Sequence, residues 1–265
     1  MPTRTLYQVD AFTDELFGGN PAAVLPLPAG PWPNDAYLQN IAAENNLAET
    51  AYFRPRPDGD FDLRWFTPTV EVRFCGHATL ASAHVLFAHR DYERDEIRFH
   101  TKELGVFTVR RAPGGFYTMN FPADELQRAL PVPGLQEGID QRVLECWRGR
   151  DDYFLVLQNE AAVRDCQPDF RTLATVKARG VVITAPGDAV DFVCRGFFPQ
   201  SGIDEDPVTG SANTSLTSLW SEKLGKTELT AQQLSQRVGN LRCRDLGERV
   251  EVSGRAVTYM IGELV

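Results

Sequence analysis

The sequence predicts an α+β fold made of two matching halves, and three observations support it. Short stretches of alternating apolar and polar residues lie between Gly, Pro and Asn clusters, which is the pattern of strands joined by turns. Two helical segments carry almost no charge and must be buried on all sides. These segments and the residues before them repeat at about half the 265-residue chain length. We therefore expect two β-barrel-like half-domains, each wrapped around one central buried helix.

The first half begins with strands that one helix interrupts. Alternating apolar residues predict strands over 5–9, 22–25, 49–53 and 61–66. An apolar stripe between the second and third of these predicts a helix. Asn34 or Asp35 can cap its start, and the pair Asn45-Asn46 can end it just before the next strand.

The two buried helices are predicted over 78–88 and 210–221. Only Thr79, Ser82 and His84 interrupt the first apolar run, and the second holds no formal charge. A helix that lacks a polar face needs walls on every side, and strands curled around it can supply them.

A repeated approach to these helices indicates an internal duplication. The matching segments are Arg64-Trp65-Phe66-Thr67-Pro68 and Arg195-Gly196-Phe197-Phe198-Pro199. The two arginines are 131 residues apart and Gly76 and Gly210 are 134 apart, so a three-residue insertion in one loop reconciles the halves. Repeats this long are not those of a solenoid. We predict half-domains over 1–113 and 114–255, with the C-terminal strand 256–265 as a candidate addition to the first.

Composition and charge argue against several classes of protein. With 27 Lys+Arg against 36 Asp+Glu, the net charge of -9 gives no basic footprint for nucleic acid. No apolar run approaches the roughly 20 residues of a membrane span and no signal-type segment opens the chain, so we expect a cytoplasmic protein. The five cysteines have no CxxC spacing, and neither metal-ligand spacings nor phosphate-binding glycine motifs occur. We expect reduced thiols and no metal or other cofactor.

An anionic substrate would need a local positive site, and the starts of the two buried helices can supply one. Each follows a loop of small or polar residues, with Gly76 or Gly210 at the junction. Free backbone N–H groups and the helix dipole attract a carboxylate there, by roughly 0.3 to 1 kcal/mol when exposed. If a pseudo-twofold axis relates the halves, both starts face one interdomain cleft, a preferred place for a small-molecule site.

Four ordered motifs span nearly the whole chain. They are Asp10-Ala11-Phe12 with Gly19-Asn20-Pro21-Ala22-Ala23-Val24, Asn46-Leu47-Ala48-Glu49-Thr50, Phe74-Cys75-Gly76-His77-Ala78-Thr79, and Glu205-Asp206-Pro207-Val208-Thr209-Gly210-Ser211-Ala212. Together they resemble the PhzF family, named for an isomerase of phenazine biosynthesis and related by fold to diaminopimelate epimerase. The resemblance implies a paired-barrel, dimeric protein that shuttles a proton on a small carboxylate substrate without a cofactor.

The resemblance also assigns the acid/base role to Glu49. A carboxylate suits this role because desolvation can raise its pKa toward neutrality, so that one group takes a proton and returns it. From the pattern alone, Glu49 would be a solvated residue at a helix-strand turn. The competing carboxylate, Glu44, falls within the helix pattern and is expected to be exposed.

Substrate-binding roles are implied for side chains on both halves, each with a structural alternative. His77 could be a polar helix-end residue or a core histidine with its hydrogen bonds satisfied. Asp206 could start the turn before a proline, and Ser211 could cap or begin a helix. The resemblance has the first two hold polar groups of the substrate and the serine hydrogen-bond the substrate or the glutamate. The other implied binding residues are Gly76 and Gly210, through their N–H groups, and more weakly Asn20, which lies in a turn signal.

Cys75 raises a rival mechanism. In related two-thiol racemases, paired cysteines remove and deliver the proton. Thr209 stands near the position where the second thiol would be expected, which disfavours this chemistry and leaves Cys75 as a buried apolar thiol. A hydrolase dyad with His77 is weaker still, because one intervening residue does not ensure that the side chains meet. The alternatives to an isomerase are a Cys75-dependent epimerase and a binding or regulatory protein without turnover.

Overall fold

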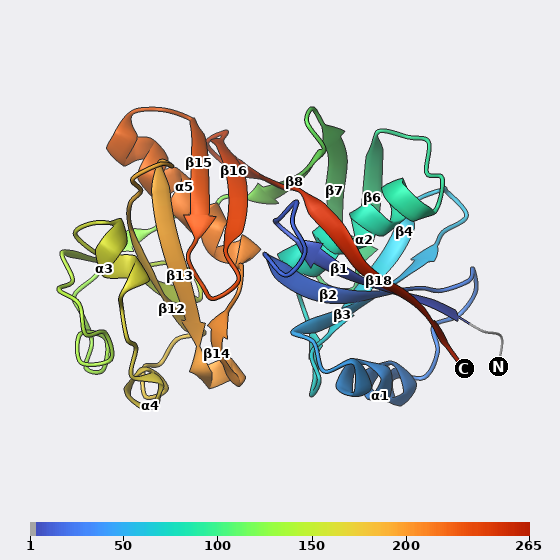
Figure 1. The fold of residues 1–265 in the computed structure, drawn as a ribbon, viewed down its shortest axis with the longest axis horizontal. Coiled ribbons are helices and arrows are strands. Elements are labelled where there is room, and N and C mark those ends of the chain that lie inside the picture. The colour runs from blue at the N-terminus through green and yellow to red at the C-terminus, as the bar shows by residue number, and fades with distance from the viewer. Residues whose placement is uncertain (1–3) are drawn as a thin grey trace. The chain divides into compact units, whose positions relative to one another are not determined.

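The computed structural model describes residues 4–265, which form two compact units (Figure 1). The first runs to Asn120 and includes Ser253–Val265, and the second is Phe121–Val252. The chain leaves the first unit within strand β8 (Phe116–Pro122) and returns to it within β17 (Arg249–Gly254). No helix in the described part of the chain is long and apolar enough to cross a membrane.

The first unit contains the strands predicted at the start of the chain. Strands β2 (Asn20–Pro26) and β3 (Glu49–Pro55) run parallel to each other, while β1 (Arg4–Ala11) pairs antiparallel with both β2 and β18 (Ala256–Leu264). The predicted strands over 5–9, 22–25, 49–53 and 61–66 are confirmed as β1, β2, β3 and β4. The elements of this unit are β1 (Arg4–Ala11), β2 (Asn20–Pro26), α1 (Asp35–Asn45), β3 (Glu49–Pro55), β4 (Phe61–Phe66), β5 (Glu71–Val72), α2 (Gly76–His89), β6 (Glu96–Thr101), β7 (Gly105–Ala112) and β18 (Ala256–Leu264).

Helix α1 has the predicted ends. Of the two candidate caps, Asn34 takes the role, because its side chain accepts a hydrogen bond from the Ala36 backbone N–H at 2.8 Å. Asn46 ends the helix with a left-handed φ of 48°, a conformation that asparagine tolerates better than most residues. Strand β3 therefore begins at Glu49 after a short turn.

Helix α2 is the central helix of the first unit. It is buried continuously from Gly76 to Leu86 and contacts β1, β2, β3 and β18. The prediction that the whole run 78–88 is buried is wrong for the last turn of the helix. Ala88 is exposed there because the helix reaches the surface.

A buried histidine in α2 makes the stability of the protein depend on pH. His84 hydrogen-bonds through Nδ1 to the Tyr117 hydroxyl at 3.1 Å and through Nε2 to Thr258 Oγ1 at 2.9 Å. Burial, with a smaller contribution from nearby His89, lowers the pKa of His84 from 6.5 to about 4. Between about pH 4 and pH 6.5, His84 is therefore protonated in the unfolded chain but not in the folded chain.

We expect this contribution to stability to be complete above about pH 6.5 and to decrease as the pH falls toward 4, by up to about 3 kcal/mol. Urea unfolding of the wild type and of His84→Gln across this range measures it. The free energy of unfolding of the variant should fall less steeply with acid. Parallel curves for the two proteins would show that His84 does not carry the dependence.

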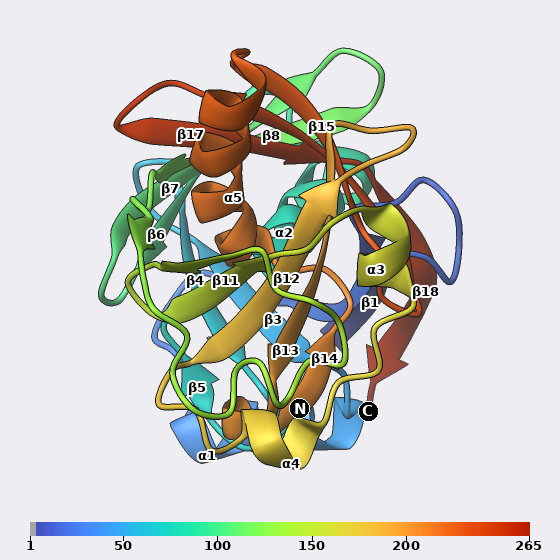
Figure 2. The ribbon, with the colours of Figure 1, turned by 90° about the vertical axis from the view of Figure 1, so that its left-hand side faces the viewer.

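The second unit repeats the strand pattern of the first. Here β12 (Gly180–Pro186) lies between parallel β11 (Asp152–Val156) and antiparallel β13 (Phe192–Phe198), as β3 lies between β2 and β4. Strand β13 also runs parallel to β15 (Glu228–Gln233), as β4 does to β6. Figure 2 shows β11, β12, β13 and β15 of this unit with α5 alongside. The elements are β9 (Gln127–Arg128), β10 (Glu145–Arg148), β11 (Asp152–Val156), α3 (Glu160–Arg164), α4 (Phe170–Leu173), β12 (Gly180–Pro186), β13 (Phe192–Phe198), η1 (Pro199–Ser201), β14 (Ile203–Asp206), α5 (Gly210–Leu224), β15 (Glu228–Gln233) and β16 (Gly239–Asp245).

Helix α5 confirms the second predicted buried helix. Leu216 and Trp220 are buried, and the Trp220 indole N–H donates to Thr184 Oγ1 at 2.9 Å. The same indole stacks on the Phe192 ring, and the centroids of the two rings are 5.9 Å apart. The apolar body of the tryptophan thus packs in the core while its polar atom has a partner.

A matching ion pair marks the repeat in each unit. Arg64 Nε lies 2.8 Å from Glu71 Oε1, and Arg195 Nε lies 2.8 Å from Glu205 Oε1. The arginines are 131 residues apart and the glutamates are 134 apart. The three-residue insertion therefore falls between each arginine and its glutamate, and in the second unit this loop contains the short helix η1.

Candidate functional site

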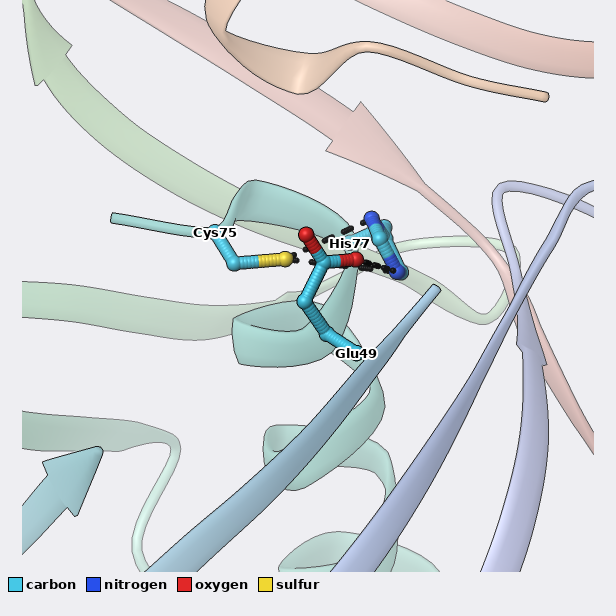
Figure 3. A group of neighbouring side chains, drawn as sticks. All are labelled: Glu49, Cys75 and His77. Atoms are coloured by element: carbon cyan, nitrogen blue, oxygen red, sulfur yellow. Dashed lines mark hydrogen bonds and ion pairs between the residues drawn. The ribbon is translucent and has the colours of Figure 1, made fainter. Parts of the chain in front are cut away.

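Three side chains meet where strand β3 and helix α2 begin (Figure 3). Glu49 is the first residue of β3, and in the sheet it lies beside Ala22 of β2. Cys75 is the N-cap of α2 with an extended backbone, and His77 lies in the first turn. The three side chains point toward one another, although Glu49 is far from the other two in sequence.

The contacts within this cluster are short and almost removed from solvent. His77 Nε2 lies 3.2 Å from Glu49 Oε2, and Cys75 Sγ lies 3.4 Å from His77 Nδ1. The side chains of His77 and Glu49 are 5% and 13% exposed. Glu49 is thus the member of the pair with more surface open to a ligand.

Electrostatics assign a neutral imidazole to this cluster. Burial lowers the pKa of His77 from 6.5 to about 3. A neutral imidazole has one N–H donor and one acceptor nitrogen. Placing the proton on Nε2, toward the Glu49 carboxylate, leaves Nδ1 to accept the hydrogen of the Cys75 thiol. This arrangement gives both ring nitrogens of His77 and the thiol a complementary neighbour, and it orients the carboxylate.

Sequence reasoning missed the contact between Cys75 and His77. One intervening residue does not by itself bring two side chains together, but the change from extended backbone at Cys75 to helix at Gly76 does so here. The thiol is buried as predicted, yet it is in a polar contact rather than in purely apolar surroundings.

The start of α5 holds the predicted residues of the second unit. Asp206 accepts a hydrogen bond from Thr209 Oγ1 at 2.7 Å, and Gln233 donates to the Asp206 backbone carbonyl at 2.7 Å. Gln233 Oε1 also accepts a hydrogen bond from the Thr209 backbone N–H at 2.8 Å. Asp206 therefore has the structural role considered from the sequence, because it holds the loop before the helix, and this role is compatible with ligand contact.

Ser211 has a partner that the sequence did not indicate. Arg179 donates from Nη2 to Ser211 Oγ at 3.1 Å and also pairs with Asp152. Arg179 directly precedes Gly180, the residue that begins β12 as Glu49 begins β3, and these two strand starts are 131 residues apart. The repeat offset was therefore the one signal that could have pointed to Arg179.

The remaining predicted residues occupy the ends of regular elements. Gly76 and Gly210 are the first residues of α2 and α5. Asn20 is fully buried at the start of β2, two residues before the neighbour of Glu49. The structure thus brings Glu49 and His77 together in one unit and places Asp206 and Ser211 near the start of α5 in the other. That the two sets share one cleft stays a prediction.

Comparisons with known proteins agree along the whole chain. A profile described as phenazine biosynthesis-like protein, PhzC-PhzF, matches residues 9–262. An uncharacterized isomerase of Pseudomonas aeruginosa is 48% identical, with 98% of each chain covered. Another of Halalkalibacterium halodurans is 40% identical over the full length of both chains.

Solved structures share the fold. A PhzF family protein of Enterococcus faecalis is 40% identical and superposes with a TM-score of 0.94, with 99% of each chain covered. A probable proline racemase of Agrobacterium radiobacter has a TM-score of 0.65 at 10% identity, covering 99% of this chain and 93% of its own. The second likeness concerns the fold alone.

Proposed function

Because the chain belongs to the PhzC-PhzF family of phenazine biosynthesis-like proteins, we propose that it is an isomerase that moves a proton on a small carboxylate substrate without a cofactor. The family resemblance and the α+β, diaminopimelate epimerase-like fold are both confirmed. Curated relatives named isomerases support this class of activity.

One observation carries the proposal: Glu49 is a nearly buried carboxylate whose Oε2 lies 3.2 Å from His77 Nε2. In its ionised form it can accept a proton from a substrate carbon, and as the acid it can return that proton to another position of the same molecule. His77 would orient the carboxylate through its N–H. In the second unit, Gly180 occupies the strand start that Glu49 occupies in the first. Of these two equivalent positions, one therefore carries a carboxylate.

The substrate's carboxylate would be held by the helix starts. The N–H groups of Gly76 and Gly210 are the proposed donors, with His77, Asp206, Ser211 and more weakly Asn20 contacting other polar groups. Arg179, which hydrogen-bonds Ser211 and pairs with Asp152, places a guanidinium group beside the start of α5.

A Cys75-dependent epimerase is the second candidate, favoured by the 3.4 Å contact between Cys75 and His77. A two-thiol mechanism needs a second cysteine on the opposite face of the substrate. Thr209 is the N-cap of α5, as Cys75 is of α2, and it has a hydroxyl in place of that thiol. A mechanism with one carboxylate, Glu49, therefore fits the residues at the two helix starts better than a two-thiol mechanism does.

A ligand can be found by screening small acids for thermal stabilisation, since a ligand at 100 times its Kd adds about 2.7 kcal/mol. With a ligand in hand, we expect turnover to persist after exhaustive chelation, because proton transfer by a carboxylate needs no metal. We also expect the absorbance spectrum of the purified protein to lack flavin and nicotinamide bands. Activity lost to a chelator and restored by a metal would refute cofactor independence.

The homodimer implied by the resemblance stays a prediction.

A further inference from the structure

We propose that Glu49, Cys75 and His77 bind a thiophilic divalent cation such as Zn²⁺, and that the bound ion inhibits the protein by occupying its acid/base carboxylate. The geometry points to such a site because one carboxylate oxygen, one thiol sulfur and one imidazole nitrogen lie within 4.8 Å of one another. Binding does not depend on the proposed function, whereas the inhibition rests on it.

The spacing of the ligand atoms suits a tetrahedral ion. Bonds of roughly 2.0 Å to nitrogen or oxygen and 2.3 Å to sulfur place neighbouring ligand atoms about 3.3 to 3.6 Å apart in a tetrahedron. Here His77 Nε2 lies 3.2 Å from Glu49 Oε2 and 3.9 Å from Cys75 Sγ. A small movement of the thiol would complete the set and leave a fourth position for water.

The charge and softness of the ligands select the cation. As the metal–sulfur bond forms, the Cys75 thiol releases its proton to solvent and the imidazole proton of His77 moves from Nε2 to Nδ1, so that Nε2 can bind the ion. Thiolate and carboxylate together neutralise the ion. A sulfur and an imidazole ligand favour Zn²⁺ or Co²⁺ over Mg²⁺, which prefers oxygen. Spacing rules could not reveal this set, because Glu49 comes from a different element than Cys75 and His77.

A second cluster, Asp58, Asp60 and His100, provides an internal comparison. Its ligand atoms also lie within 4.8 Å of one another. However, Arg56 Nε lies 3.3 Å from Asp58 and Arg98 Nε lies 3.4 Å from Asp60. These guanidinium groups already neutralise the carboxylates and repel a cation, so we expect no competing site there.

Binding is tested with Co²⁺, whose thiolate charge-transfer band and ligand-field bands report a Cys ligand and tetrahedral geometry. Reduced wild-type protein should bind a single ion per chain, and Zn²⁺ but not Mg²⁺ should displace it. Cys75→Ala should lose the charge-transfer band. Calorimetry should show Zn²⁺ binding to Cys75→Ala and His77→Asn weakened by more than the roughly 100-fold that loss of a supporting partner costs.

Matched variants keep the test specific. Cys146→Ala removes a buried thiol of the other unit and His100→Asn removes the histidine of the second cluster, so both should bind as the wild type does. Circular dichroism checks that each variant is folded. The proposal is overturned if wild type gives no charge-transfer band, or if His100→Asn abolishes binding while Cys75→Ala retains it.

The inhibition is measured separately, on turnover of a screened ligand. Zn²⁺ should stop wild-type turnover at the same concentrations at which it binds, and a chelator should restore it. Cys75→Ala should need far more Zn²⁺ for the same inhibition. Turnover unaffected by bound Zn²⁺ would overturn the inhibition while leaving the binding site standing. A chain that binds Zn²⁺ but turns over no ligand with metal removed would contradict the proposed function instead.

Discussion

Glu49→Gln should lower turnover by roughly 10² to 10⁴-fold, the usual cost of losing a general acid/base, while folding and ligand binding stay nearly intact. Glutamine keeps the shape of the side chain and can still contact His77 across the 3.2 Å that now separates the imidazole from the carboxylate. It cannot exchange a proton with a substrate carbon. Steady-state kinetics and a ligand-binding isotherm on the same preparation separate the two effects.

Two variants serve as controls for this result. Glu44→Gln removes an exposed carboxylate of α1 five residues away, and it should not affect turnover. Cys75→Ala should reduce turnover far less than Glu49→Gln does. The reverse order would favour the Cys75-dependent epimerase, and an unimpaired Glu49→Gln enzyme would remove the proposed role of the carboxylate.

Arg179→Met should lower the free energy of unfolding by about 3 kcal/mol, because it leaves a buried carboxylate without its cation. The Asp152 side chain is 4% exposed, and Arg179 Nε donates to its Oδ1 at 2.9 Å while Nη2 contacts Oδ2. The same substitution removes the donor to Ser211, so we also expect weaker binding of an anionic ligand.

Denaturant unfolding of three further variants tests the cause. Arg244→Met breaks the exposed pair with Glu228 in the same unit and should cost less than about 1 kcal/mol. Adding Asp152→Asn to Arg179→Met should restore part of the loss, because the unpaired charge is gone, whereas Asp152→Asn alone sets the baseline. A cost for Arg179→Met no larger than that for Arg244→Met would show that the pair is not important for stability.

Local signals in the sequence were sufficient for the strands and helices that were predicted in the first unit and for the buried helix of the second. The helix ends at Asn34 and Asn46 depend on side-chain and backbone preferences of single residues, so they could be predicted without the rest of the fold. The uncharged runs of α2 and α5 predicted buried helices for a similar reason. Within these runs Ala88 is exposed, where an apolar run reaches the surface at the end of the helix, and Phe87, Ser211 and Ser218 are half-buried.

The contacts of the candidate site could not be predicted from the residues alone. The family resemblance selected Glu49 and His77, but their 3.2 Å approach depends on where β3 begins beside β2 and on how α2 starts. The partner of Ser211, Arg179, is distant in sequence and belongs to no motif. Such contacts are set by strand register and by helix starts, which single-residue preferences do not determine.

The central claim, that Glu49 moves a proton on a bound substrate, is tested most directly by hydrogen exchange in heavy water. A ligand identified by thermal stabilisation is incubated in heavy water with metal-free wild type or with Glu49→Gln, and deuterium on its carbon atoms is measured by mass spectrometry. We expect deuterium in ligand recovered from the wild type and almost none from the variant, although both bind the ligand. Equal incorporation by both proteins, or none by a wild type saturated with ligand, would contradict the claim.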